Sequence, residues 1–283
     1  MVLVAYNRAA TLGRTLDSLL VQTYQDFELI ISDDCSTDDT EQVARRYEAL
    51  DKRVRYRRNA TNLSMPGNLN AAIEEARGQY IANLHDGDVY NPRLLEAWHT
   101  ALERCKDAAF VFNAYRMLDR RGETAQLFVE PLPACVPGSV LLEKIFFRRW
   151  RFDSPVWGTV MARRSAYQAH GLFDPRFGFC SDVDMWMRFA SRNRVAYVSE
   201  PLISLAGRDE LPSGNPEGFW HQRRLLYRMF LEARRRQFAS RPLRRATEVG
   251  KHYLFIALFV CYHYALAVRR GVLVAIGVRR RRG

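Results

Sequence analysis

The chain has 283 residues, of which 48% are hydrophobic and 26% charged, a composition that is typical of a folded protein and excludes a wholly disordered one. The formal net charge of +12 is concentrated at one end. Residues 220–283 hold 16 of the 43 Lys and Arg but only two of the 31 Asp and Glu, whereas residues 1–219 are nearly neutral. The basic charge therefore belongs to an appended segment, and the length suits one large domain with such an appendage.

The cysteine content excludes two classes of small domain. The five cysteines are widely spaced and include no Cys-x-x-Cys pair; they are Cys35, Cys105, Cys135, Cys180 and Cys261. We expect neither a disulfide framework nor a zinc site from this pattern. The first residues, Met1 to Ala5, are typical of a buried strand rather than a signal peptide, so a reducing cytosol is favoured.

Short apolar runs alternate with segments of helical spacing along the first two thirds of the chain. We predict strands at 2–5, 27–32, 54–56, 79–84, 108–114, 156–162 and 194–198. The segments between them predict helices from about Leu12, from Ser36 or Thr37 to Leu50, over 68–77, from Asn91-Pro92 and over 184–192. This order predicts an α/β fold with a doubly wound, mostly parallel sheet, whose ligands bind beyond the carboxyl ends of the strands.

Acidic residues follow two of the predicted strand ends. Asp33 and Asp34 follow one strand, and Asp86-Gly87-Asp88 follow another. Mg²⁺ usually takes one or two protein carboxylates and fills its other positions with water and substrate phosphates, and Gly87 would let the backbone approach those phosphates. The same residues also fit plain turns or helix caps. Their neighbours decide between these interpretations.

Four motifs in order resemble the family 2 glycosyltransferases, which are inverting enzymes of the GT-A fold. They are Ala5-Tyr6-Asn7 with Leu16 to Thr23, Ile31 to Asp38, His85 to Asp88, and Ser181 to Arg188. The resemblance extends from Val4 to about Ala206. It implies a GT-A domain over residues 1–215, with a nucleotide-binding half at 1–115 and an acceptor half at 116–215.

The resemblance assigns roles to residues of the nucleotide-binding half. Asp34 would accept a hydrogen bond from the uracil of a UDP donor, and the backbone of Val4, Ala5 and Tyr6 would line the base pocket. Asp86 would contact the ribose or the water shell of a Mg²⁺ or Mn²⁺ ion. Asp88 would be the metal ligand, and the ion would stabilise the charge on the departing diphosphate.

In the acceptor half, Asp182 resembles the catalytic base that receives the proton of the acceptor hydroxyl. An exposed Asp with a pKa near 4 is a weak base, so we expect the proton to move late, as the oxygen bonds to carbon. Asp184 competes for the role, because only one of the two easily faces the cleft. Arg188 would orient or pair with these carboxylates, and Trp186 is expected in the core.

The sequence departs from the family pattern at two places. Gly67-Asn68 stands where many relatives have Arg-Asn, so an arginine that assists the nucleotide is missing there; Arg57 or Arg58 could substitute. Further on, Arg208 is the candidate for a phosphate contact in a loop that otherwise does not match.

Residues 216–283 form a separate helical, basic and apolar segment. His252 to Val268 carry no formal charge, and Arg269-Arg270 and Arg279 to Arg282 flank the apolar runs. A 17-residue helix is about 25 Å long, short of the roughly 30 Å hydrocarbon core. An in-plane or re-entrant anchor on an anionic leaflet therefore fits better than a spanning helix, and a core-packed helix is the remaining alternative.

These observations predict an inverting, metal-dependent glycosyltransferase at the cytoplasmic face of a membrane. It would move a sugar from a nucleotide donor to a hydroxyl acceptor, either lipid-linked or a saccharide. Nucleic acid is not expected as a partner, because no recognition motif accompanies the basic residues. A dinucleotide oxidoreductase is disfavoured, because no Gly-x-Gly-x-x-Gly follows a strand. Nucleotidyl transfer is disfavoured too, since the loop after the first strand lacks glycines. A catalytically inactive scaffold of the same fold remains the alternative.

Overall fold

The computed structural model describes residues 1–119, 121–148, 156, 158–205, 225, 228–233 and 235. The chain divides into two compact units, Met1–Phe219 and Trp220–Gly283. The apolar runs of the predicted tail and Arg208 lie outside the described residues. The fold below is that of the first unit.

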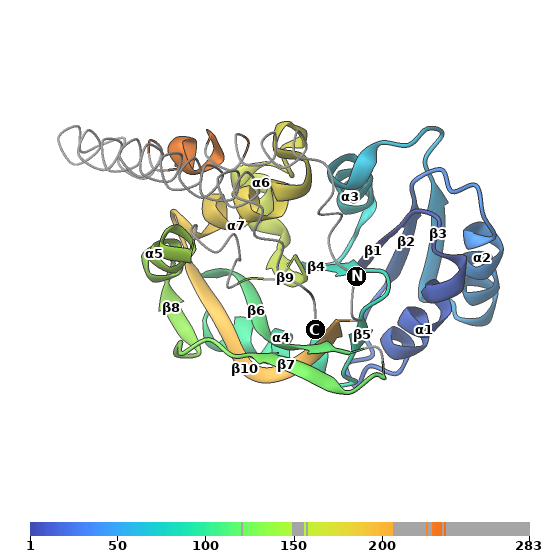
Figure 1. Cartoon of the computed structure of the whole chain (residues 1–283), viewed down its shortest axis with the longest axis horizontal. Helices are drawn as coiled ribbons and strands as arrows, with labels where there is room; N and C mark the ends of the chain where they lie inside the picture. The colour runs from blue at the N-terminus through green and yellow to red at the C-terminus, as the bar shows by residue number, and fades with distance from the viewer. Residues whose placement is uncertain are drawn as a thin grey trace, which may run out of the picture. The chain divides into compact units, whose positions relative to one another are not determined.

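The N-terminal half is a regular alternation of strands and helices (Figure 1). In chain order it comprises β1 (Val2–Ala5), α1 (Ala9–Leu20), β2 (Leu29–Asp33), α2 (Thr40–Leu50), β3 (Val54–Arg58), α3 (Ser64–Glu75) and β4 (Tyr80–His85). The four strands lie in the order β3-β2-β1-β4 and are all parallel. This is the arrangement that the alternating sequence pattern predicts.

The second half extends the same sheet with strands of mixed direction. Its elements are β5 (Val89–Tyr90), α4 (Leu94–Arg104), β6 (Ala108–Leu118), β7 (Thr124–Phe128), β8 (Cys135–Pro137), α5 (Gly138–Arg148), β9 (Val160–Arg163), α6 (Arg164–His170), the 3₁₀ helix η1 (Pro175–Cys180), α7 (Ser181–Ala190) and β10 (Arg194–Leu205). β9 lies antiparallel between β4 and β6, and β10 runs parallel to β6. The predicted α/β fold with a central, mostly parallel sheet is confirmed.

Helices cover both faces of the sheet. On one face, Leu12, Leu16 and Leu19 of α1 pack with Trp98 of α4 in one apolar core, and all four side chains are fully buried. These residues recur at the spacing of one helix face, which is why the segment forms a helix against the sheet. On the other face, Trp186 of α7 packs against Phe110 of β6, with ring centroids 5.3 Å apart. Trp186 therefore belongs to the core, as predicted.

Several element boundaries differ from the sequence prediction. α3 begins at Ser64 instead of 68, because Pro66 lies in its first turn, where the missing N–H of proline costs no hydrogen bond. β9 begins at Val160 instead of 156. α7 begins at Ser181 instead of 184, which puts Asp182 and Asp184 in its first turn. The shift matters for the candidate active site.

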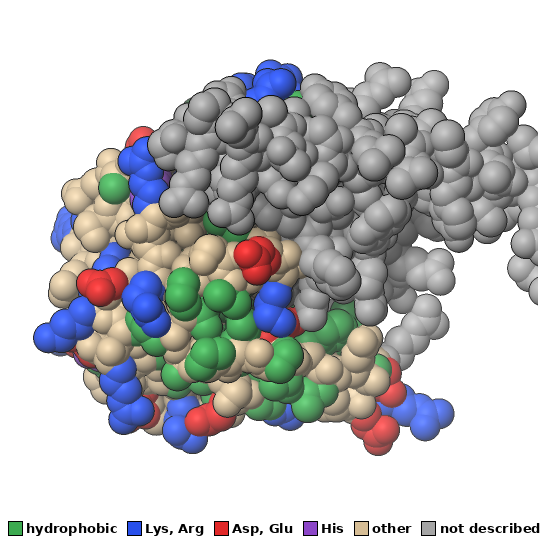
Figure 2. Space-filling view, turned by 90° about the vertical axis from the view of Figure 1, so that its left-hand side faces the viewer, with side chains coloured by type: hydrophobic (Ala, Val, Ile, Leu, Met, Phe, Trp, Pro, Cys, Tyr) green, Lys and Arg blue, Asp and Glu red, His purple; other side chains and the backbone are tan. Residues whose placement is uncertain are grey.

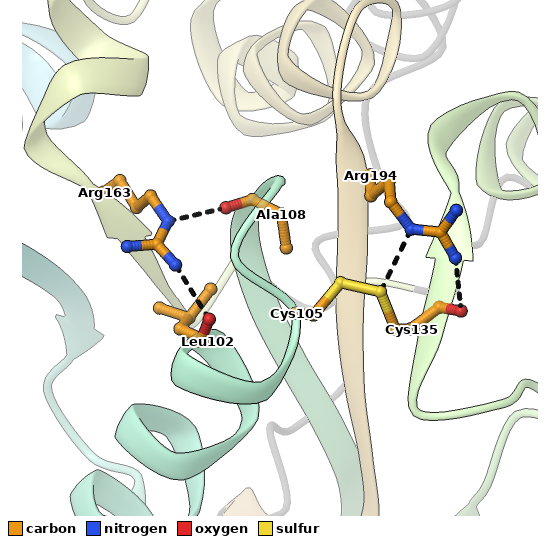
Figure 3. Close-up of a disulfide and its surroundings, with 6 residues drawn as sticks. All are labelled: Leu102, Cys105, Ala108, Cys135, Arg163 and Arg194. Carbon is orange, nitrogen blue, oxygen red and sulfur yellow. Dashed lines mark hydrogen bonds between the residues drawn. A yellow bond between two sulfur atoms is a disulfide. The ribbon is translucent and has the colours of Figure 1, made fainter.

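The expectation of cysteines without disulfides is wrong for one pair. Cys105 and Cys135 are joined, and Figure 3 shows how the bond ties the end of α4 to β8. Arg194 of β10 donates hydrogen bonds to Cys135 Sγ and to the Cys135 carbonyl oxygen, both at 3.1 Å. The 30-residue separation hid the pairing, because it depends on the sheet bringing α4 and β8 together. Cys35 and Cys180 are free thiols.

The side of the molecule that carries α5 and β8 has hydrophobic side chains gathered on its surface (Figure 2). Leu127 of β7 and Val129, which directly follows β7, are exposed. Within the described ranges, the helices are all too short or too polar to cross a bilayer.

Candidate active site

The carboxyl ends of β1, β2 and β4 meet at one edge of the sheet (Figure 1). β1 pairs with β2 so that Ala5 lies opposite Asp33, and it pairs with β4 so that Val4 lies opposite His85. Because parallel strands end at the same edge, Asp34 and Asp86 follow the strands on either side of β1. The structure thus gathers the predicted nucleotide and metal residues at this edge.

The loops after β1 and β2 are joined by hydrogen bonds. Asn7 has a left-handed φ of 53°, a conformation that Asn adopts more readily than most residues. Its side-chain oxygen accepts from the Thr37 backbone N–H at 2.8 Å, and its own N–H donates to Ser36 Oγ at 2.9 Å. The next residue, Arg8, donates its N–H to the Thr40 hydroxyl at 2.7 Å. These contacts fix the two loops relative to each other.

Asp34 is buried at the end of β2. Its Oδ1 accepts hydrogen bonds from Asn59 Nδ2 and from the Leu63 N–H, both at 2.8 Å. Its own N–H donates to the Ala5 carbonyl oxygen at 2.9 Å, which places Asp34 beside the end of β1. There Val4 and Ala5 are buried, whereas the Tyr6 side chain is 45% exposed. An exposed tyrosine one residue beyond the strand end that bonds Asp34 suits the binding of a nucleotide base.

The Asp33 carboxylate is bonded to neighbouring groups of the protein. It is fully buried and accepts hydrogen bonds from the Ser36 N–H at 2.9 Å and the Tyr56 hydroxyl at 2.7 Å. Arg58 forms ion pairs with Asp33 at 3.3 Å and with Glu41 at 3.2 Å. The prediction that Arg58 binds the nucleotide finds no support in this arrangement, because its guanidinium is committed to the β2–α2 junction.

Position 67 has no room for the arginine that many relatives carry. A Cβ atom on Gly67 would lie 2.8 Å from the Leu63 Cβ, so any side chain there requires a shift. Arg57, the other proposed substitute, forms an ion pair with Glu75 at 2.8 Å. Two other arginines contact the acidic turn: Arg8 forms an ion pair with Asp86, and Arg14 donates to the Gly87 carbonyl oxygen.

The turn from Asp86 to Asp88 has a left-handed glycine at its centre. Gly87 has a φ of 84°, which side chains other than glycine rarely tolerate, and a Cβ there would meet nothing within 4 Å. The side of Gly87 on which a Cβ would stand is therefore open to a ligand. Asp86 keeps part of its carboxylate exposed, whereas Asp88 is 2% exposed.

The donor set of this turn fits a hard cation. Both side chains offer carboxylate oxygens, which Mg²⁺ and Mn²⁺ prefer. Among the residues that the structure describes, His, Cys, Asp and Glu nowhere form a group of three that could hold a metal ion. A site with three protein ligands is not needed when one or two carboxylates bind the ion together with substrate phosphates.

Asp182 lies in the first turn of α7 with its Oδ1 accepting a hydrogen bond from the Val183 N–H at 2.7 Å. Burial of the carboxyl group raises its pKa to about 6, and hydrogen bonds from its own N–H and that of Val183 oppose the shift. The sequence-based expectation of an exposed aspartate with a pKa near 4 is therefore wrong. A pKa near 6 gives a stronger base that is still largely ionised at neutral pH.

Asp184 and Arg188 form a structural pair. Asp184 is 1% exposed, and its Oδ2 accepts from Arg188 Nε at 2.7 Å. The same guanidinium donates to the carbonyl oxygen of Leu172 at 2.7 Å and to that of His170. Arg188 thus connects α7 to the last residue of α6 and to the segment that follows it. The two aspartates therefore differ in their partners: Asp184 is paired with Arg188, and Asp182 is not.

Asp182 lies near the end of β4. A Cβ atom on Gly158 would lie 3.2 Å from Asp182 Oδ2 and 2.7 Å from His85 Nε2. Both side chains therefore approach the same glycine, and His85 directly precedes Asp86. This convergence brings the acidic turn after β4 close to the carboxylate in the first turn of α7.

Comparison with known proteins decides the family. Residues 1–171 match the family model described as glycosyl transferase family 2. The chain belongs to this family. It is 30% identical over 192 residues to the putative glycosyltransferase EpsE of Bacillus subtilis, covering 67% of this chain and 65% of that protein. It is 32% identical over 126 residues to the putative teichuronic acid biosynthesis glycosyltransferase TuaG of the same organism, covering 44% and 49%. The chain spans less than two thirds of the length of these relatives.

Solved structures support the GT-A fold. Crystal structures of S. aureus TarS residues 1–349 superpose with a TM-score of 0.64 at 20% identity, covering 83% of this chain and 64% of that one. The complex of the same protein with UDP-GlcNAc gives a TM-score of 0.62 at 19% identity, covering 84% and 72%.

Sequence reasoning missed Arg8, Asn59 and Gly158 at this site. Arg8 is the third residue after the first strand, and its partner Asp86 lies 78 positions away, so no local pattern could pair them. Asn59 follows β3 directly, and its place beyond a strand end is a signal that could have found it. Gly158 carries no side chain, so only its neighbours reveal its place.

Proposed function

We propose that the chain transfers a sugar from a UDP-sugar to a hydroxyl acceptor with inversion at the anomeric carbon, in the synthesis of a cell-surface polysaccharide or glycolipid. The observation that carries this proposal is Asp182: a carboxylate with a pKa raised to about 6 that approaches Gly158 together with His85, next to the Asp86–Asp88 turn. A base of this strength beside a diphosphate-type site suits transfer to an alcohol.

In the proposed reaction, the acceptor hydroxyl oxygen forms a bond to the anomeric carbon while the bond from that carbon to the diphosphate oxygen breaks on the opposite face. The electron pair of the broken bond leaves with the nucleoside diphosphate. The hydroxyl proton passes to Asp182, whose carboxylate becomes a carboxylic acid until it releases the proton to solvent. Asp34 and the backbone of Val4 to Tyr6 hold the uracil, and Asp86 contacts the ribose.

Asp88 and Asp86 are the residues that would hold a Mg²⁺ or Mn²⁺ ion. When bound, such an ion supplies positive charge against the diphosphate that develops as the leaving group. Arg8, already paired with Asp86, and Arg14, bonded to the Gly87 carbonyl oxygen, add positive charge at the same turn.

The relatives support the donor and the setting of the proposal. TarS has been solved with UDP and with UDP-GlcNAc, and TuaG is named for teichuronic acid biosynthesis. For this chain, the basic tail would hold the enzyme at the cytoplasmic face of a membrane, where a lipid-linked or saccharide acceptor is presented.

The test is a donor screen with the purified chain and its Asp182→Asn variant. UDP-, GDP- and dTDP-sugars are incubated with Mn²⁺ or Mg²⁺, and nucleotide release and UDP binding are measured. We expect release from a UDP-sugar, its abolition by EDTA, and a loss of at least a hundredfold in the variant with UDP binding retained. Because the substitution removes a charge whose burial is unfavourable, the thermal stability of the variant should be unchanged or higher.

Asp184→Asn is the matched control. It removes a carboxylate two residues away but breaks the pair with Arg188, so we expect reduced thermal stability. Full turnover by Asp182→Asn would exclude the base assignment. UDP binding by the unmodified chain without any nucleotide release would instead favour the catalytically inactive scaffold.

A further inference from the structure

One face of α1 holds the Asp86–Asp88 turn and the chain that follows it. Arg14 donates to the Gly87 carbonyl oxygen at 3.0 Å, and Ser18 Oγ accepts from the Tyr90 N–H at 3.2 Å. One turn further on, Gln22 Nε2 donates to the Asn91 carbonyl oxygen at 2.9 Å. Arg14 and Ser18 are four residues apart within α1, so they lie on the same side of the helix, and Gln22 follows just beyond its C-terminal end.

Thr15 lies at the centre of this face and is bonded to the turn itself. Its Oγ1 accepts from the Gly87 N–H at 3.0 Å and donates to the Asp88 carbonyl oxygen at 2.9 Å. The side chain is fully buried. A single hydroxyl therefore satisfies one donor and one acceptor of the acidic turn, using its O–H and one of its acceptor lone pairs.

These bonds fix the backbone conformation that the turn requires. Gly87 has a φ of 84°, and glycine loses more conformational freedom on ordering than other residues do. The bonds to the Gly87 N–H and to the Asp88 carbonyl oxygen enclose two residues, Gly87 and Asp88, and so restrain the φ and ψ angles of both. The direction of the Asp88 side chain follows from the same dihedral angles.

We infer that Thr15 is a positioning residue, which holds the Asp86–Asp88 turn in the geometry in which Asp88 binds the metal ion of a nucleoside diphosphate donor. This inference rests on the proposed function for the identity of the ligand. The evidence for the positioning role is independent of the ligand: it is the pair of hydrogen bonds that the buried Thr15 hydroxyl makes to the turn.

The test compares Thr15→Val with Thr15→Ser. Valine keeps the volume and β-branching of threonine but has no hydroxyl, whereas serine keeps the hydroxyl. The first readout is hydrogen exchange at the Gly87 amide, which needs no activity. The second is the binding of UDP at increasing Mn²⁺ concentration.

We expect Thr15→Val to lose protection at the Gly87 amide and to need on the order of tenfold more Mn²⁺ for half-maximal UDP binding, as loss of one to two net hydrogen bonds would give. Thr15→Ser should retain both properties. Ser18→Ala is the matched control: it removes a hydroxyl from the same helix face whose partner, Tyr90, lies beyond the turn. Ser18→Ala should change neither readout. Thr15→Val and Ser18→Ala should both lower the thermal stability.

Unchanged Mn²⁺ dependence in folded Thr15→Val would overturn the inference, whether or not the Gly87 amide exchanges faster. An equal shift in Ser18→Ala would also overturn it, because the effect would then be general to the helix. If the unmodified chain binds no UDP at any Mn²⁺ concentration, the proposed function fails. In that case the Gly87 amide still tests whether Thr15 positions the turn. Loss of its protection in Thr15→Val, but not in Thr15→Ser, supports that role, and retained protection in Thr15→Val refutes it.

Discussion

At the residue scale, the main lesson concerns two aspartates that look equivalent in the sequence. Asp182 and Asp184 both lie in the first turn of α7, where the helix dipole favours negative charge. The structure distinguishes them by their partners, since Asp184 is bonded to Arg188 whereas Asp182 approaches Gly158 and His85. No spacing rule predicts this division, because it depends on where the segment after α6 places the carbonyl groups that Arg188 contacts.

The raised pKa of Asp182 predicts a pH dependence. Below the pKa of about 6 the carboxyl group is protonated and cannot accept the acceptor proton, so activity should fall as the pH decreases. We expect kcat/KM to decrease about tenfold per pH unit below about pH 6. Just above that pH, kcat/KM should no longer change with this group. The measurement is transfer rate against pH, with UDP binding followed over the same range as a control. A bend near pH 4, the ordinary value for Asp, would contradict the prediction.

At the element scale, the sequence predicted the parts of the fold that local patterns encode. The buried strands β1, β2, β4 and β6 are continuous apolar runs, and α1 has one apolar face, so each appears near its predicted place. β7, β8, α5 and α6 were not predicted. β7 is exposed at nearly every position, and β8 has only three residues, so neither has the alternation that marks a strand. The hydrogen bonds from α1 to the acidic turn and the residues after it were not predicted, because in the sequence Thr15 and Ser18 look like ordinary polar residues of a helix surface.

The disulfide between Cys105 and Cys135 is a prediction at this scale, because it ties α4 to β8. Closing a loop of about 30 residues stabilises the fold by roughly 3–4 kcal/mol in the chain-entropy model. The denatured, unreduced protein should therefore show three reactive thiols among its five cysteines. Cys135→Ser should unfold at a lower temperature, and the reductant that lowers the unfolding temperature of the unmodified chain should have no effect on this variant.

Cys35→Ser is the matched control, since Cys35 is a free thiol outside the bridge. It should leave the unfolding temperature and its response to reductant unchanged. Five reactive thiols in the unreduced protein would show that the bridge does not form under the conditions of preparation, which is the outcome that a reducing cytosol would favour.

At the scale of the whole molecule, charge is distributed unevenly along the chain. The glycosyltransferase unit is nearly neutral, with as many acidic as basic residues to within two, whereas residues 220–283 carry 16 Lys and Arg. A neutral catalytic unit does not by itself concentrate on an anionic surface. The basic tail is thus the part of the sequence that would bring the acidic turn and Asp182 to a membrane-bound acceptor.

This division predicts binding to anionic vesicles that depends on salt and on the tail arginines. At about 0.1 M salt, the chain should float with vesicles that contain phosphatidylserine and not with purely zwitterionic ones, and salt near 1 M should weaken the binding by screening. Each basic residue near such a surface contributes about 1 kcal/mol, so replacing Arg279 to Arg282 by Gln should weaken binding by roughly two to three orders of magnitude. Four Arg→Gln substitutions at Arg45, Arg46, Arg93 and Arg104 in the catalytic unit lower the net charge equally and should have little effect. Equal binding to zwitterionic vesicles would show that the apolar runs, rather than the charges, anchor the chain.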